Sequence, residues 1–184
     1  GVLLASTGAT VTNVDFVNNV AGAYLLGAGD GTVVSYSTFY GTGTNHSPND
    51  GAGITAYGDA AYTLLVNHCS FDNLGMSPIH NGTGYVVTVT NSAFGNYASV
   101  SEYRRGFYSA GPVPATIEDS EDYNAYHIAS NLMYREGFGA IADGANTIDT
   151  GSYAGVFSGT TSAGDWQVPL ALQTAASDGT AIGA

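Results

Sequence analysis

The sequence contains no lysine, one cysteine and only five prolines among 184 residues. Its three basic residues are Arg104, Arg105 and Arg135, against fifteen acidic residues, so the formal net charge is −12. Because so acidic a chain repels phosphate backbones and anionic lipids, we expect no binding to nucleic acid. No apolar run reaches the roughly 18 residues of a membrane-spanning helix, so we also expect no membrane insertion.

The single cysteine, Cys69, lies in the strand-like run LLVNHCSF and has no partner for an internal disulfide. We therefore expect a buried residue that serves packing. A reactive thiol would need an activating neighbour, for which His68 is the adjacent candidate.

The chain is rich in glycine, with 26 residues placed between short runs of Val, Ile, Leu, Tyr and Phe. Stretches long enough for an amphipathic helix are nearly absent. This composition predicts a strand-rich protein with glycine in its turns. No shift in composition divides the chain, so we predict a single domain over residues 1–184.

One sequence unit recurs along the chain. Its copies are VTNVDFVNN at 11–19, VVSYSTFYG at 33–41, LLVNHCSFDN at 64–73, VTVTNSAFGN at 87–96 and, more weakly, TIEDSEDYN at 116–124. The aligned aromatic residues, which we predict to stack in the core, are Phe16, Phe39, Phe71, Phe94 and Tyr123. Their spacings of 23, 32, 23 and 29 residues are typical of a solenoid whose coils carry loop insertions of different length.

The apolar alternation changes phase inside each copy. Val87 and Val89 share one parity, whereas Ser92 and Phe94 share the other. One flat strand would place half of these side chains in water, so we predict two short strands that meet at a bend. The predicted bend residues are Asn13, Tyr36, His68 and Asn91.

These patterns predict an all-β fold, a right-handed parallel β-helix solenoid of about five coils. A second short apolar element after each unit supplies another face of the coil. Stacked coils would pair equivalent strands in parallel and align the phenylalanines in a column. The alternative is an antiparallel sandwich, which gives no reason to repeat one motif in register.

Three motifs mark the carboxy-terminal part of the chain: DYNAYH at 122–127, DGANTID at 143–149 and DWQVPLALQTAASDGTAIGA at 165–184. They resemble the end of pectate-lyase-like right-handed β-helix proteins, and the resemblance covers about residues 85–184. It implies a closing segment at 143–184, although GSYAGVF stands where the family commonly has D-P-x-F. It implies no single function, because that superfamily includes lyases, hydrolases, epimerases, tailspikes, adhesins and surface-layer components.

A calcium-dependent lyase of acidic polysaccharides needs carboxylates for the metal and a basic residue to abstract a proton. The candidate bases are Arg104 and Arg105. The candidate calcium ligands are Glu118, Asp119, Glu121 and Asp122. The alternative is that an exposed arginine pair balances an acidic loop, and the surplus negative charge disfavours a polyanionic substrate. Whether the protein is an enzyme stays open here, with the balance against it.

Two glycosylation sequons lie in predicted loops, at Asn45-His-Ser47 and Asn81-Gly-Thr83. Asn45 and Asn81 are therefore candidate glycan acceptors.

Two functions fit the sequence. The first is an extracellular or cell-surface structural or adhesive protein, such as the subunit of a self-assembling filament, because a short β-helix must be capped or stacked at its open ends. Residues 1–10 would then form an amino-terminal strand or arm that pairs with a neighbour. The second is a polysaccharide-active enzyme of the calcium-dependent polyuronate lyase type, or a glycan-binding tailspike-like module. The expected partners are copies of the chain, neighbouring surface proteins or polysaccharide.

Overall fold

The computed structural model describes residues 1–19, 21–26, 30–41, 51–97, 106–110, 119–127, 132–136, 139–157 and 167–183. Strands dominate these ranges. The helical elements are one short helix, α1 (Tyr153–Val156), and one 3-10 turn, η2 (Leu170–Leu172). None of the helices in the described ranges has the length and apolar character needed to cross a membrane.

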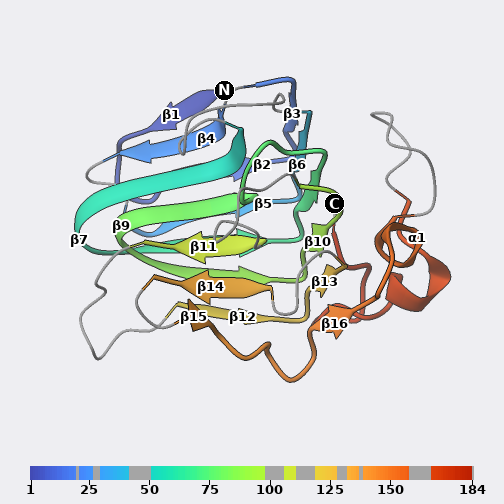
Figure 1. Cartoon of the computed structure of the whole chain (residues 1–184). Coiled ribbons are helices and arrows are strands. Elements are labelled where there is room, and N and C mark those ends of the chain that lie inside the picture. Colours follow the sequence, from blue (N-terminus) through green and yellow to red (C-terminus); the bar gives the residue numbers. More distant parts are fainter. Residues whose placement is uncertain are drawn as a thin grey trace.

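The strands stack in three columns, which we name faces 1, 2 and 3 (Figure 1). Face 1 contains β1 (Val2–Leu4), β4 (Ala21–Leu26), the first part of β7 (Ala52–Asn67), the first part of β9 (Ile79–Thr90), β11 (Phe107–Ser109) and β14 (Met133–Arg135). Face 2 contains β2 (Thr10–Thr12), β5 (Thr32–Ser35), the second parts of β7 and β9, and β12 (Ser120–Asp122). Face 3 contains β3 (Asp15–Val17), β6 (Thr38–Tyr40), β8 (Ser70–Asp72), β10 (Ala93–Phe94), β13 (Ala125–Tyr126) and β16 (Ile148–Asp149).

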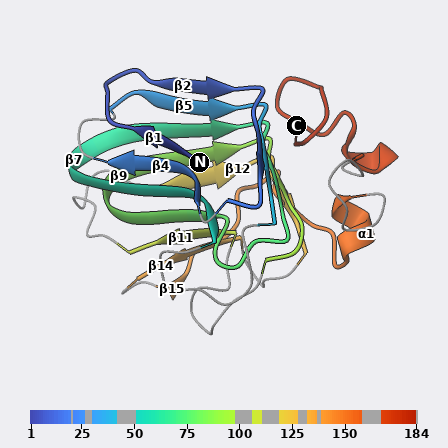
Figure 2. The same ribbon diagram turned by 90° about the horizontal axis from the view of Figure 1, so that it is seen from above.

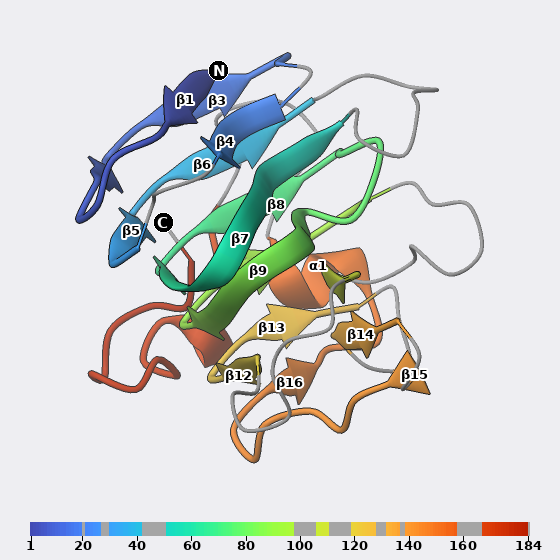
Figure 3. The same cartoon turned by 90° about the vertical axis from the view of Figure 1, so that its left-hand side faces the viewer.

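Every pairing from one coil to the next is parallel, so the predicted β-helix solenoid is confirmed, with five to six coils. The antiparallel exception among the described strands is β15 (Gly139–Ala140), which pairs with β14 in the last coil. Figure 3 shows β1, β4, β7 and β9 stacked in chain order, with β14 and β15 at the far end. At the opposite end, β1 pairs with β4 on one side, so Val2–Leu4 belongs to the first coil.

Left-handed residues turn the chain between faces 2 and 3. The residues with positive φ at this corner are Asn13 (55°), Tyr36 (46°), His68 (49°), Asn91 (54°) and Tyr123 (57°). The predicted bend is therefore confirmed at all four expected positions. Asparagine adopts this conformation readily, whereas a bulky residue does so only where surrounding contacts hold it there.

Four phenylalanine rings form a column inside the solenoid. Phe16, Phe39, Phe71 and Phe94 follow one another in register, with centroid separations of 4.8, 4.9 and 4.9 Å and nearly parallel planes. Such ring contacts add to the stabilisation that burial alone provides.

Tyr123 does not continue this column, so the sequence alignment was wrong at the fifth coil. Ala93 pairs with Ala125, which places the buried Tyr126 after Ala125 as Phe94 follows Ala93. Tyr123 instead lies at the left-handed corner, in the position of Asn91. The spacing between aligned aromatic residues in successive coils therefore alternates between 23 and 32 residues, and the predicted last spacing of 29 was wrong.

Glycines lie against the edges of the stacked rings. A Cβ atom at Gly53 would lie 2.8 Å from Cδ1 of Phe71, and one at Gly22 would lie 2.5 Å from Cδ1 of Phe39. Neither distance is compatible with a side chain. The close stacking of the rings thus requires glycine at the start of face 1 in these coils.

We expect Gly53→Ala to destabilise the fold by about 1 to 3 kcal/mol, because the added methyl group overlaps the Phe71 ring. Urea unfolding followed by circular dichroism measures the change. In a double-mutant cycle, Phe71→Leu should relieve part of the overlap, so the two costs should be less than additive. Strict additivity would contradict this account of the glycine.

Candidate functional site

The predicted calcium ligands that the structure describes, Asp119, Glu121 and Asp122, do not converge. Glu121 pairs with Val89, a core residue, and so points into the solenoid, whereas the adjacent Asp122 lies on the opposite side of the strand. Asp119 Oδ1 accepts a hydrogen bond from Val87 N at 2.8 Å. Glu118, Arg104 and Arg105 lie outside the described residues. Within the described ranges no group of three or more His, Cys, Asp or Glu side chains could hold a metal ion.

The buried carboxylate of Glu121 and the half-buried one of Asp143 lie in the last coil instead. Glu121 accepts hydrogen bonds from Asn124 Nδ2 (3.0 Å), the Thr147 hydroxyl and Gly144 N. Asp143 accepts from the Tyr126 hydroxyl at 2.6 Å and from Leu132 N at 2.8 Å. Burial raises the pKa of Glu121 despite its three donors. These carboxylates satisfy backbone and side-chain donors where the apolar column ends, which is a structural role.

A second acidic group, Asp72, lies beneath α1 on the outer side of face 3. Its Oδ1 accepts from Asn96 N at 2.8 Å, and its Oδ2 accepts from the Tyr153 hydroxyl at 2.9 Å. The His127 ring meets Tyr153 edge-on at 5.8 Å. Burial raises the pKa of Asp72 and lowers the pKa of His127. Perturbed groups of this kind can mark an active site, but Asp72 is 1% exposed and holds α1 in place, so no substrate reaches it.

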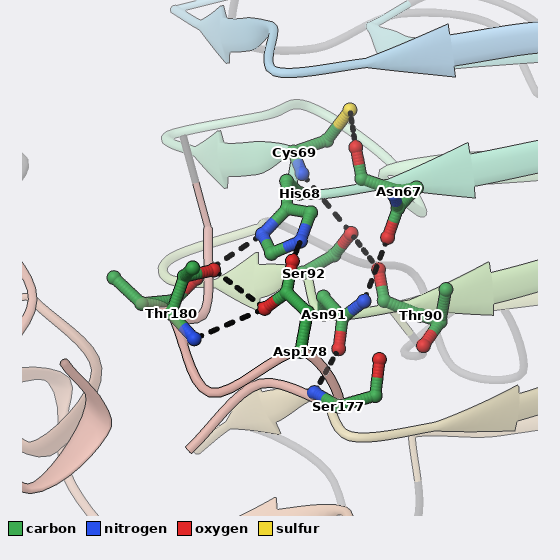
Figure 4. A network of polar contacts seen from close by, with 10 residues as sticks. Asn67, His68, Cys69, Thr90, Asn91, Ser92, Ser177, Asp178 and Thr180 are labelled. Carbon is green, nitrogen blue, oxygen red and sulfur yellow. Dashed lines mark hydrogen bonds and ion pairs between the residues drawn. The ribbon is translucent and has the colours of Figure 1, made fainter. Parts of the chain in front are cut away.

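The carboxy-terminal segment returns to the corner between faces 2 and 3 (Figure 4). We define the segment as Ser177–Gly183. His68 Nδ1 lies 3.1 Å from Ala181 O, and His68 Nε2 lies 3.1 Å from Asp178 Oδ2. Asn91 accepts from Ser177 N at its side-chain Oδ1 (2.8 Å) and from Gly183 N at its main-chain oxygen (2.7 Å). No motif in the sequence predicts these contacts, because the partners are 86 to 113 residues apart.

Cys69 is buried, as expected, and His68 does not activate it. The Cys69 Sγ lies 3.6 Å from both Val34 O and Asn67 O, inside the solenoid. Burial raises the pKa of the Cys69 thiol to about 12. The His68 ring contacts the carboxy-terminal segment and stacks on Tyr36 at 4.8 Å.

The outward side of face 1 carries a row of aromatic rings, four from tyrosine and one from histidine. Tyr24, Tyr57, His80, Tyr108 and Tyr134 follow one another with centroid separations of 5.2 to 6.0 Å. His80 and Tyr108 are 4% and 3% exposed, so the middle of this row is closed to a large ligand. Burial lowers the pKa of His80 to about 4, which keeps the imidazole neutral.

Face 2 differs from the other two faces in its outward surface. In Figure 2 the strands of face 2 follow one another in the order β2, β5, β7, β9 and β12. The outward residues of its first four coils are Thr10, Thr12, Val33, Ser35, Thr63, Leu65, Asn67, Val86, Thr88 and Thr90, and all but Ser35 are at least partly exposed. None of these residues is charged. Asp30, just before β5, and Asp122, at the end of β12, lie at the edges of this uncharged surface. A shallow depression lies over Val33, Leu65 and Val86.

Neither sequon adds an open site within the described residues. Asn81 is fully buried, and its Nδ2 donates to Tyr85 O at 2.8 Å and to Ser109 Oγ at 3.3 Å. Nδ2 is the atom that a glycan would join, and in the folded chain it is not accessible. Asn45 lies outside the described residues.

Comparison of the chain with protein-family models, with curated proteins and with solved structures finds no match.

We expect Cys69 in the folded protein to resist maleimide at about pH 8, because only the thiolate reacts. Labelling should follow unfolding, and urea should make it fast. Mass spectrometry measures the rate. His68→Gln should not slow labelling, whereas a slower reaction in this variant would show that His68 activates the thiol.

We expect His80 to destabilise the fold as the pH falls from about 6.5 to about 4. The unfolded chain binds the proton more tightly than the folded chain, so acid favours unfolding, by up to about 3 kcal/mol. In His80→Phe this contribution is absent. The difference in unfolding free energy between the two proteins should thus be constant above about pH 7 and change below it. A difference independent of pH would contradict the prediction.

Proposed function

We propose that the chain is a structural or adhesive β-helix module of an extracellular or cell-surface protein, and that face 2 is its contact surface. The observation that carries the proposal is that face 2 combines exposure with absence of charge over four coils. Face 3 lies under α1 and the carboxy-terminal segment, and the middle of face 1 is buried. The partners that we propose are copies of the chain or neighbouring surface proteins.

Electrostatics supports contact through this face. Two molecules that each carry a formal charge of −12 repel one another, and the repulsion is weakest where the facing surfaces carry no charge. Val33, Leu65 and Val86 supply apolar area at the centre of face 2, and threonine hydroxyls surround it. An apolar centre with a polar rim is the usual anatomy of a protein interface.

The first coil supports stacking in the direction of the solenoid axis. In the described part of the chain, β1, β2 and β3 each pair with the following coil on one side. Their other edges present backbone donors and acceptors, and Leu3 and Val17 are 62% and 41% exposed. A further coil, from the same or another polypeptide, would pair with these edges.

Membership of the pectate-lyase-like superfamily remains part of the proposal, supported by the carboxy-terminal motifs and the parallel β-helix. In that setting, glycan binding at face 2 is a second candidate function. Hydroxyl groups pair across coils at 3.3 Å, Ser35 with Thr12 and Thr88 with Ser120, beside the apolar residues. Such a surface fits a neutral polysaccharide better than a polyuronate, which the negative charge repels. A polyuronate lyase would depend on Arg104 and Arg105.

We expect Leu65→Asp to weaken self-association at least about tenfold, because it places a charge at the centre of face 2. Sedimentation velocity over a concentration series measures the association constant. Leu170→Asp is the matched control, since Leu170 is 82% exposed in η2, away from face 2, and this variant should associate like the wild type.

Retention on insoluble cellulose and chitin, measured with the same variants, separates the two functions. A wild-type protein that stays monomeric but is retained, with loss of retention in Leu65→Asp, would favour glycan binding. A protein that neither associates nor is retained would overturn face 2 as a contact surface.

A further inference from the structure

The docked carboxy-terminal segment places two hydrogen-bond acceptors against one imidazole. Ala181 O can only accept, and it lies 3.1 Å from His68 Nδ1. The Asp178 carboxylate lies 3.1 Å from Nε2. Neutral histidine carries a single N–H, so it satisfies one of these contacts and turns a lone pair toward the other oxygen. Both contacts are favourable only when both ring nitrogens carry protons.

We propose that His68 and Asp178 form a proton-controlled latch, in which protonated His68 holds Ser177–Gly183 on the solenoid and loss of its proton releases the segment. This inference stands independently of the contact surface on face 2.

The surroundings of His68 make the ring the switching group. Its titratable contacts among the described residues are Asp178 in the segment and Tyr36, whose ring stacks on it at 4.8 Å with an angle of 5°. The neighbouring Cys69 directs its thiol to Val34 O and Asn67 O. Two hydrogen bonds from Thr180 lower the pKa of Asp178, so this carboxylate stays ionised in weak acid. Imidazole, by contrast, changes charge between about pH 5 and about pH 8.

Release would uncover part of the outer surface of face 3. Besides the His68 contacts, Asn91 bonds to Ser177 N and Gly183 N, and Ile182 packs with Ala93 and Ala125. Gly183 packs over Ser70 in β8 and Ala93 in β10. Both side chains point outward from face 3 and are buried in the folded chain. Because Asn91 is neutral, these bonds do not themselves respond to pH. His68 therefore sets the pH dependence of docking.

Hydrogen exchange resolved by NMR tests the latch, after correction for the intrinsic rate at each pH. The protection of the Ser177 and Gly183 amides should fall roughly tenfold between about pH 5 and about pH 8, since a charge-assisted hydrogen bond is lost. The amides of Ala93 and Gly95, which bond to Cys69 O and Phe71 O, should keep their protection and serve as reference. At the low pH, the ¹⁵N shifts of His68 should show protons on both ring nitrogens.

Variants separate the latch from general stability. His68→Gln should have low protection of Ser177 and Gly183 at every pH, whereas His80→Gln should keep the wild-type pH dependence. Asp178→Asn should also lose protection. Its matched control is Asp30→Asn, because Asp30 accepts two hydrogen bonds from Thr63 as Asp178 does from Thr180, but without a histidine. Protection that is independent of pH in the wild type, or an unchanged pH dependence in His68→Gln, would overturn the proposal.

Discussion

The stacking of equivalent residues from coil to coil is the constraint on which the rest of this structure depends. Each coil must return its strands to the same three faces, so the chain must turn at the same places in every coil. The left-handed corner at Asn13, Tyr36, His68 and Asn91 makes one of those turns. The phenylalanine column then aligns three residues after each corner residue, with ring separations close to the distance between strands.

The same constraint explains why the carboxylates of Glu121 and Asp143 lie where the apolar column ends. A solenoid interior is continuous along its axis, so it must change character where the stack ends. Here the phenylalanine and valine interior gives way to Glu121 and Asp143, which accept hydrogen bonds from backbone and side-chain donors of the last coil, including the Tyr126 hydroxyl. Burial in this network raises the pKa of Glu121, so that shift has a structural cause. Glu121 and Asp143 thus mark the end of the apolar column among the described residues.

The three faces become different through what covers them, although the coils that build them are alike. The carboxy-terminal region lies against face 3, where Phe157, Leu172 and Ile182 pack with Ala93 and Ala125. Face 2 keeps an exposed, uncharged surface in a strongly acidic molecule. The described residues thus leave face 2 exposed, whereas across the corner His68, Asn91 and the apolar packing of Ile182 hold the carboxy-terminal segment. This asymmetry is the basis for both proposals.

By itself, the sequence determined the solenoid, the corner positions and the four phenylalanines, because these depend on a pattern that recurs within each coil. It misplaced Tyr123, since an insertion cannot be located where the repeat is weak. In the structure Tyr123 is the corner residue of the fifth coil, and Tyr126 takes the position that follows Phe94 in the column. Only the tertiary structure decided that the acidic run is divided between the interior and the surface, that Asn81 is buried, and that His68 meets Asp178. Those outcomes depend on contacts across coils and on a returning segment, for which residues near in sequence carry no information.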